Sequence, residues 1–207
     1  MLQKKIIVLK KIKYAETNLI LHTLSSEGER LNFIARHAVK GSKRFATGTL
    51  DPLHYLNVSY TEAKSGDLNL LKEAQIIEDF YSLRKNYDCL NISLYFLSFV
   101  SKLTHESLDG NKELFNLLGN TLKILKKFSK QDVKEDILNQ LKLRFEMKAL
   151  HQQGVYPEGL GDSDLLSKSI LEHPISLSSE DLIKTEAIKL KIHHSLKEYL
   201  PNFKKGF

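Results

Sequence analysis

The sequence contains little cysteine chemistry. Cys89 is the single cysteine among 207 residues, which excludes an intramolecular disulfide and a zinc site built from several cysteines. Cys89 lies in an apolar stretch, YDCLNISLYFLSFV. We therefore interpret it as a small core residue, with a reactive thiol as the alternative.

Long hydrophobic runs are also missing. No apolar segment approaches the roughly 18–20 residues that a membrane-spanning helix needs, and the first residues, MLQKKIIVLKK, lack a small-residue cleavage site. We expect a cytoplasmic protein with no membrane partner. A hydrophobic fraction of 42% beside 27% charged residues predicts a folded chain.

Catalytic motifs are absent as well. The sequence has no GxSxG, no HExxH and no dinucleotide fingerprint. GVYPEGLG at 154–161 has the glycine spacing of a phosphate loop but lacks its Lys and Ser/Thr, and His194 with Glu198 supplies only two metal ligands. We predict no catalytic residue, no cofactor and no metal site, and therefore a protein that is not an enzyme.

Positive charge is present and unevenly distributed. The net charge is +6, whereas residues 1–48 alone hold seven lysines and three arginines against Glu16, Glu27 and Glu29, an excess of +7. A local field of one sign attracts polyanions. The leading partner class is therefore nucleic acid, or else an acidic protein tail.

The first eighty residues read as strands separated by turns. Gly28 and Gly66 stand where two hairpin turns need them, and a longer loop at 39–52 joins the third and fourth runs. The runs of strand-forming residues are 4–11, 17–24, 30–38, 53–63 and 68–77. Five such strands suit a closed OB-type barrel, a fold that holds single strands of nucleic acid on strand faces and loops.

The period changes to that of helices near residue 79. Apolar residues three or four apart, such as Tyr87, Leu94 and Val100, predict a long buried helix over 80–104. Further helices are expected at 111–127, 132–152 and 180–200. The fold class is therefore α+β, with an OB-fold domain at 1–79 and a C-terminal α-helical bundle domain at 80–207 that packs rigidly against it.

The segment RHAVKGSKR, residues 36–44, is the candidate binding surface. Arg36, Lys40, Lys43 and Arg44 supply four cations in nine residues without an acid, and His37 adds partial charge. Gly41 and Ser42 let the backbone follow a phosphodiester chain. Four phosphate contacts would give a log–log salt slope of about −3 on single strands. The alternative is a solvated loop.

Other residues complete this candidate surface. Lys10, Lys11 and Lys13 are expected to extend it, with Lys4 and Lys5 as possible flanking contributors. Phe45, with Phe33 or Tyr55 on neighbouring strands, is expected to offer a base a stacking platform.

A series of residues near the start keeps a definite order: Tyr14, Glu16, Leu19, Gly28, Ala35, Arg36, Ala38, Lys40, Ser42, Lys43, Arg44, Phe45, Leu50 and Pro52. Two later segments extend this series, LNLLKEAQIIEDFYSLRKN at 68–86 and LKEYLPNFKKGF at the end. Their order resembles that of the RecO family of recombination mediators, most strongly in the first ninety residues.

The resemblance implies a non-catalytic, nucleoid-associated protein of recombinational repair. Members bind single- and double-stranded DNA, anneal complementary strands, cooperate with RecR to load RecA, and recognise the acidic C-terminal tail of single-strand-binding protein. Basic residues of the helical half are candidates for that tail: Lys126, Lys127, Lys142, Arg144, Lys204 and Lys205.

One departure from the family concerns zinc. Many members have a four-cysteine zinc module after the helix that here ends near Gln153, whereas this chain has GVYPEGLGDSD and no cysteine there. Zinc dependence is therefore not carried over. The alternative function is a protein-interaction adaptor whose OB-like domain binds an acidic partner and no nucleic acid.

Overall fold

The computed structural model describes residues 1–41, 44–106, 111–156, 166, 169–170, 187–194 and 196–197. Five strands form a closed barrel in the order β1-β2-β3-β5-β4, in which β3 and β5 pair in parallel and the other neighbours pair antiparallel. The strands are β1 (Leu2–Tyr14), β2 (Asn18–Ser25), β3 (Arg30–Ala35), β4 (Tyr55–Thr61) and β5 (Leu68–Glu78). The predicted five-stranded barrel is confirmed.

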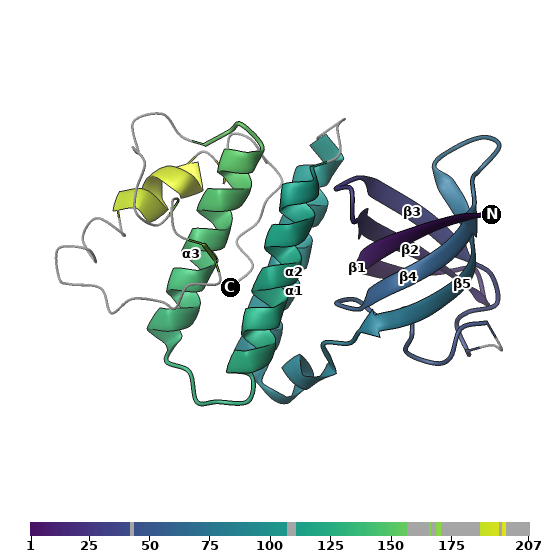
Figure 1. The fold of residues 1–207 in the computed structure, drawn as a ribbon, viewed down its shortest axis with the longest axis horizontal. Coiled ribbons are helices and arrows are strands. Elements are labelled where there is room, and N and C mark those ends of the chain that lie inside the picture. The colour runs from purple at the N-terminus through teal and green to yellow at the C-terminus, as the bar shows by residue number, and fades with distance from the viewer. Residues whose placement is uncertain are drawn as a thin grey trace.

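Helices follow the barrel and cover one end of it. Figure 1 shows α1 and α2 between the barrel and α3. The elements are the 3-10 helix η1 (Tyr81–Lys85), α1 (Tyr87–Glu106), α2 (Lys112–Phe128) and α3 (Glu135–Gln152). Residues 187–194 and 196–197 are also helical, and the rest of the helix expected at 180–200 lies outside the described residues. The α+β class, a barrel followed by helices, is thus confirmed.

Several strand ends differ from the prediction, and two of them are set by backbone conformation. The third strand was expected to reach residue 38 but ends at Ala35, and His37 has a φ of 54°. The fourth was expected from residue 53 but begins at Tyr55, because Leu53 has a φ of 78°. A left-handed residue cannot continue an extended strand.

The helix expected at 80–104 is interrupted at Asn86. This residue is extended, and its side-chain Oδ1 accepts a hydrogen bond of 3.0 Å from the backbone N–H of Cys89, as a helix cap does. The predicted buried face was also partly wrong. Tyr87 is 77% exposed and Leu94 is 45% exposed, whereas Val100 is buried as expected.

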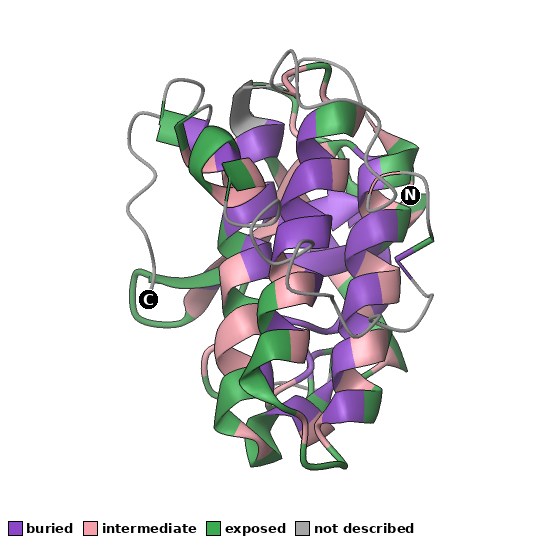
Figure 2. Ribbon diagram, turned by 90° about the vertical axis from the view of Figure 1, so that its left-hand side faces the viewer, coloured by how far each residue is buried: buried purple, intermediate pink, exposed green. Residues whose placement is uncertain are grey.

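Strand β1 contributes to two hydrophobic cores. Ile6 and Val8 point into the barrel core with Phe33 and Leu56, because alternate residues of a strand point to opposite faces. Ile7 and Leu9 point the other way, into a core that the helices build. Figure 2 shows the buried faces of the helices turned inward and their exposed faces outward. One strand therefore joins barrel and helices.

The hairpin between β2 and β3 also contacts the helices. Gly28 has a φ of 85°, and a Cβ atom placed on it would clash with the backbone of Asn111. Asn111 is the N-cap of α2, and its side chain accepts hydrogen bonds from the backbone N–H groups of Glu113 and Leu114. Glycine is needed here both for the turn and for the close approach.

In the described part of the chain, no helix is both long enough and apolar enough to cross a bilayer.

Candidate nucleic-acid interface

The loop between β3 and β4, residues 36–54, carries the predicted basic segment and is anchored to the barrel. Ala38, Phe45 and Leu50 are buried in the barrel core. The backbone N–H of Val39 donates to the carbonyl oxygen of Thr17 at 3.0 Å, in the turn between β1 and β2. These contacts hold the loop against the barrel, while Arg36, His37, Lys40 and Arg44 remain exposed.

The loop cations that the structure describes are exposed. Arg36, Lys40 and Arg44 all lie at the surface, and within the described residues none of the three forms an ion pair. His37 is exposed, and its backbone N–H donates to the Oδ1 of Asn18 at 3.1 Å. The fourth predicted cation, Lys43, lies outside the described residues. Their role in binding remains a prediction.

Gly41 fixes the turn inside this loop. Its φ is 77°, and a Cβ atom placed on it would lie 2.7 Å from the Oγ1 of Thr47. We predicted this glycine as a source of backbone freedom. In the structure, Gly41 has the left-handed conformation of a turn and packs closely against Thr47, and both features require glycine.

The three predicted lysines of β1 point to two sides of the strand. Lys10 is the register partner of His22, whereas Lys11 and Lys13 are the partners of Leu21 and Leu19, which belong to the barrel core. Cross-strand partners share a face. Lys10 therefore lies on the outer surface, while Lys11 and Lys13 lie on the inner side, where the strand extends beyond the closed part of the barrel.

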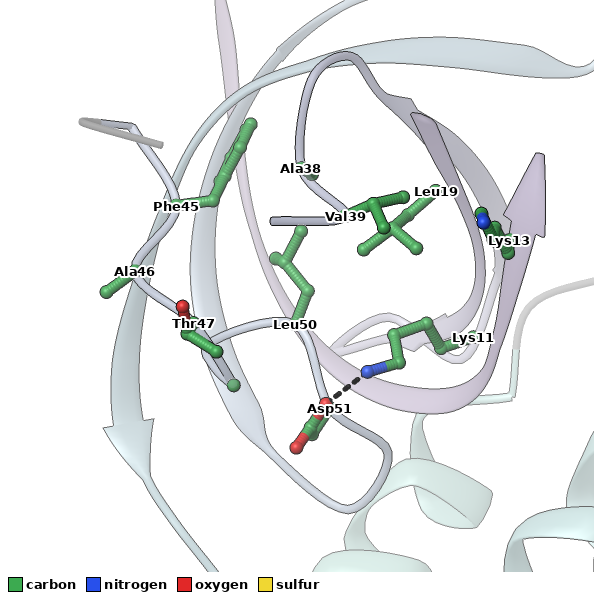
Figure 3. Close-up of a pocket in the computed structure, with 11 residues that line it drawn as sticks. Lys11, Lys13, Leu19, Ala38, Val39, Phe45, Ala46, Thr47, Leu50 and Asp51 are labelled. Carbon is green, nitrogen blue, oxygen red and sulfur yellow. Dashed lines mark hydrogen bonds and ion pairs between the residues drawn. The ribbon is translucent and has the colours of Figure 1, made fainter. Parts of the chain in front are cut away.

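A hollow of about 350 Å³ lies between this end of β1 and the loop. Figure 3 shows Lys11 and Lys13 on the β1 side, with Val39, Leu50 and Leu19 toward its middle. The floor is apolar and one wall carries two ammonium groups. The structure thus brings the β1 lysines to the same end of the barrel as the basic loop.

Asp51 is a partner of Lys11 that the sequence did not reveal. Its carboxylate forms an ion pair with Lys11 and lies 3.5 Å from the Nη2 of Arg84 in η1. Lys11 and Asp51 are 40 positions apart in the sequence, so no local pattern could have paired them. Lys11 is consequently less available to an anion than Lys13, for which the described residues show no ion pair.

The predicted aromatic platform is wrong. Phe45 is 1% exposed and Phe33 is fully buried. Tyr55 packs against the helical core, with its ring 5.7 Å from that of Phe115. All three side chains hold the fold together, so none of them is open to a base. The aromatic ring that lies open on this part of the barrel is Tyr14, which is 52% exposed at the end of β1.

The flanking lysines near the chain start differ from each other. Lys4 forms ion pairs with Glu27 and with Glu29, the latter at 3.3 Å, so its charge is offset locally. Lys5 is exposed on the same strand.

Several basic residues of the helical half are occupied. Lys126 lies 3.3 Å from the carboxylate of Glu78, and Arg144 is buried and donates to the carbonyl oxygen of Ser169 at 2.5 Å. Lys142 lies 4.0 Å from the ring centre of Tyr95. Lys127 is exposed, whereas residues 204 and 205 lie outside the described residues. Of these candidate residues that the structure describes, Lys127 is therefore the exposed one.

Most residues of the candidate metal and phosphate motifs lie outside the described residues. Glu198, residues 157–165 and so most of GVYPEGLG lie outside the described residues. Within the residues that are described, no three His, Cys, Asp or Glu side chains gather closely enough to hold a metal ion.

Cys89 is buried, as the sequence suggested. Its side chain is 1% exposed, and burial, with a smaller contribution from Asp88, raises the pKa of its thiol to about 11. A thiol that stays protonated at neutral pH is a poor nucleophile. The core interpretation of Cys89 is confirmed.

Comparison with known proteins identifies the family. Residues 1–80 match the family described as recombination protein O N terminal. The DNA repair protein RecO of Alkaliphilus metalliredigens is 31% identical over 151 residues, which cover 72% of this chain and 57% of that protein. The proteins of the same name from Desulfosudis oleivorans and Thermodesulfovibrio yellowstonii are 32% identical over 155 residues and 35% identical over 126 residues.

The match covers a defined part of these relatives. The shares are 73% of this chain and 55% of the Desulfosudis protein, and 61% and 49% for the Thermodesulfovibrio protein. The chain therefore spans about half the length of the curated relatives that it matches. With the OB-type barrel in place over the residues that the family model matches, the resemblance seen in the sequence is confirmed, and the chain belongs to the RecO family.

Proposed function

We propose that this protein binds single- and double-stranded DNA and serves in recombinational DNA repair. The relatives are named DNA repair proteins, which supports the repair role. The observation that carries the proposal is the set of exposed cations around one end of the barrel, which is listed here: Arg36, Lys40, Arg44, Lys10 and Lys13. No ion pair within the described residues offsets them.

The mechanism is electrostatic and involves no covalent step. Each lysine or arginine that neutralises a phosphate releases condensed counterions, so binding weakens as salt rises, with a log–log slope of about −0.7 per contact on single strands. Two DNA strands held by their backbones on one cationic surface keep their bases free to pair. Strand annealing is therefore part of the proposal.

The finer steps follow from the family and remain proposals. They are cooperation with RecR to load RecA onto DNA coated with single-strand-binding protein, and recognition of that protein's acidic C-terminal tail. Lys127 and other exposed lysines of the helical half are available for that tail.

Charge removal tests the DNA surface. The variant Arg36→Ala/Lys40→Ala/Arg44→Ala should weaken the binding of a fluorescent oligonucleotide and make the salt slope about two units shallower, since three contacts are lost. A control variant with the same loss of charge is Lys123→Ala/Lys127→Ala/Lys130→Ala, at exposed positions in and just after α2. Fluorescence anisotropy over a salt series measures both.

Two outcomes reject the proposal. Equal losses in the loop variant and the α2 variant would mean that net charge, and not the barrel surface, governs binding. If the unmodified protein binds an acidic peptide but neither single strands nor duplex, the chain is instead a protein-interaction adaptor.

A further inference from the structure

In the described part of the chain, the second half of β5 has one edge without a partner strand. A short ladder closes the barrel, because β5 pairs with β3 through Leu68, Asn69 and Leu70, whereas its pairing with β4 continues to Glu78. Within the described residues, no backbone hydrogen bond joins residues 73–77 to an element other than β4. We call residues 73–77 the free β5 edge.

Burial along the free β5 edge agrees with this missing neighbour. Ala74 and Ile76 are the register partners of Val58 and Leu56, which are buried in the barrel core. Cross-strand partners share a face, so both residues point to the core side of β5. Ile76 is nevertheless 41% exposed, and Ile77 beside it is 46% exposed. The side of β5 away from β4 is therefore open to solvent at an inward-facing isoleucine.

The sequence of the free β5 edge does not block the approach of another strand. Unpaired N–H and C=O groups attract a further strand, and proteins commonly prevent this with lysine, proline or a bulge at the edge. Residues 73–77 have the sequence EAQII, with neither lysine nor proline. The irregularities in the register with β4 lie at the two ends of the stretch, at Lys72 and Ile77. Isoleucine also favours the extended conformation. This edge can therefore accept an added strand.

The charge of this region decides what kind of strand fits. Residues 62–79 hold five acids and two lysines, a net charge of −3, in a chain whose net charge is +6. Glu73 is exposed, and it lies on the outer face of β5 as the register partner of Ser59. Opposite charges on neighbouring strands are favourable and like charges are unfavourable. An added strand should therefore carry basic residues on its outer face and apolar residues on the face of Ile76.

Two other occupants fit this edge less well. A strand of nucleic acid would bring phosphates to a segment that is itself negative. A second copy joined through the same edge would bring together two segments that each have a net charge of −3, and like-charge contacts across an interface are unfavourable. An extended basic segment of another protein meets neither objection.

We propose that the free β5 edge binds a partner protein by strand addition, and that the bound segment is extended, with basic and apolar residues in alternation. In such complexes, main-chain hydrogen bonds give affinity and alternate side chains give specificity. The basic side chains lie near Glu73, and the apolar ones lie beside Ala74 and Ile76. No residue of this edge belongs to the cationic set proposed for DNA, so the inference does not depend on the proposed function.

Hydrogen exchange on the full chain tests strand addition directly. The probe is a short peptide of alternating lysine and valine, and mass spectrometry follows the exchange of backbone amides. The peptide should slow exchange in the segment that contains residues 73–77 and leave α1 and α2 unchanged, because the added strand pairs with free N–H groups of that edge. A peptide of alternating glutamate and valine is the charge control, and it should give no protection there.

A third peptide separates strand addition from simple attraction between charges. It has the lysine–valine sequence with N-methyl groups along its whole backbone, so that it keeps its charge but cannot donate main-chain hydrogen bonds. Because several such bonds are lost, its affinity, measured by fluorescence anisotropy, should be about tenfold or more lower. Equal affinities of the two peptides would show that charge alone holds them and would overturn strand addition.

Two variants locate the binding site. Ile76→Lys places a charge on the inward face of the edge, which blocks an added strand and repels a basic peptide, so affinity should fall about tenfold or more. Its matched control is Leu94→Lys on α1, where the native side chain is 45% exposed. Glu73→Lys changes an exposed residue and leaves the core intact, and it should also weaken binding. Its control is Asp132→Lys, at an exposed position after α2. Both controls should bind the peptide normally.

The outcomes decide between the possible occupants. Protection confined to the free β5 edge, and lost in Ile76→Lys and Glu73→Lys, supports the proposal. No protection at a large excess of peptide, or protection that persists in both variants, overturns it. If the unmodified protein sediments as a dimer and Ile76→Lys as a monomer, the edge belongs to a second copy. If an oligonucleotide protects the edge, it belongs to nucleic acid. Oligonucleotide affinity, measured on the same samples, reports separately on the proposed function.

Discussion

Asp51 is a single carboxylate that lowers the positive charge around Lys11 and Arg84. It holds Lys11 from β1 and lies near Arg84 from η1, so it connects the loop to both the barrel and the helical half. Partly exposed ion pairs contribute at most about 1 kcal/mol to stability. Their effect on the charge offered to a ligand is larger than their effect on the fold.

Removing this carboxylate should strengthen DNA binding. In Asp51→Asn, Lys11 loses its counterion, so affinity should rise and the salt slope should steepen by about 0.7 on single strands. Stability should fall by less than about 1 kcal/mol. The comparison is Asp132→Asn, an exposed acid between α2 and α3, measured in the same salt series. A lower affinity in Asp51→Asn would show that Lys11 needs its partner for correct placement.

Cys89 makes a pH-dependent contribution to stability. Its folded-state pKa of about 11 lies above the ordinary value of 9.0, because burial favours the neutral thiol. The contribution is therefore fully present below about pH 9 and is lost as pH rises from about 9 to about 11. The difference in unfolding free energy between the unmodified protein and Cys89→Ala should shrink across that window. Urea unfolding at several pH values measures it, and a constant difference would contradict the burial argument.

The sequence predicted the cations but not their surroundings. Arg36, Lys40 and Arg44 could be located because they cluster within nine residues of a charge-rich segment. The ion pair of Asp51 with Lys11 could not be predicted, because the two residues are 40 positions apart in the sequence. The prediction that Phe45 stacks on a base was wrong. An aromatic residue in a basic loop can either bind a base or fix the loop to the core, and only the packing of the side chain distinguishes the two.

At the scale of elements, the contact between the β2–β3 hairpin and α2 is unusually close. Asn111 uses its side chain to cap α2 and also donates from its Nδ2 to the carbonyl oxygen of Gln152 at 2.9 Å. Gly28 packs directly on its backbone. The start of α2, the end of α3 and a barrel hairpin therefore meet at one residue.

Two glycines with similar backbone angles should respond differently to the same substitution. Gly28→Ala should destabilise by about 2 kcal/mol or more, since the left-handed angle and the clash with Asn111 add together. Gly66 has a φ of 80°, but no atom lies within 4 Å of a Cβ added there. Gly66→Ala should therefore lower the free energy of unfolding by only about 1 kcal/mol. Denaturant unfolding compares them. Equal losses would mean that the hairpin moves away from α2 at little cost.

Element type was more predictable than element boundaries. Alternation of apolar residues located all five strands, and three-to-four spacing located α1, α2 and α3, because both patterns report burial directly. The break at Asn86 and the end of β3 depend on a side-chain cap and on the left-handed conformation of His37. Neither leaves a periodic trace in the sequence.

At the scale of the whole molecule, β1 makes the barrel and the helices interdependent. Ile6 and Ile7 are adjacent and almost fully buried, yet one belongs to the barrel core and the other to the helical core. The division into domains at residues 79 and 80 remains a proposal. A fragment ending at residue 79 would expose Ile7, Leu9 and Leu24.

This sharing predicts a single unfolding transition. Ile6→Ala and Ile7→Ala should each cost about 2–5 kcal/mol, as expected for a large buried aliphatic side chain. In both variants the helical signal in far-UV circular dichroism and the signal of a barrel tyrosine should shift to the same denaturant midpoint. Separate midpoints in Ile7→Ala would show that the two halves unfold independently.

The parallel pairing of β3 with β5 also bears on how the protein is made. It joins residues 32–34 to residues 68–70, a separation of 36 positions. Antiparallel neighbours such as β1 and β2 can pair as soon as they emerge from the ribosome, but this ladder must wait until β5 has been synthesised. The basic loop is therefore translated before its barrel can close, and the nascent chain passes through a stage in which that charge is present without the fold that orders it.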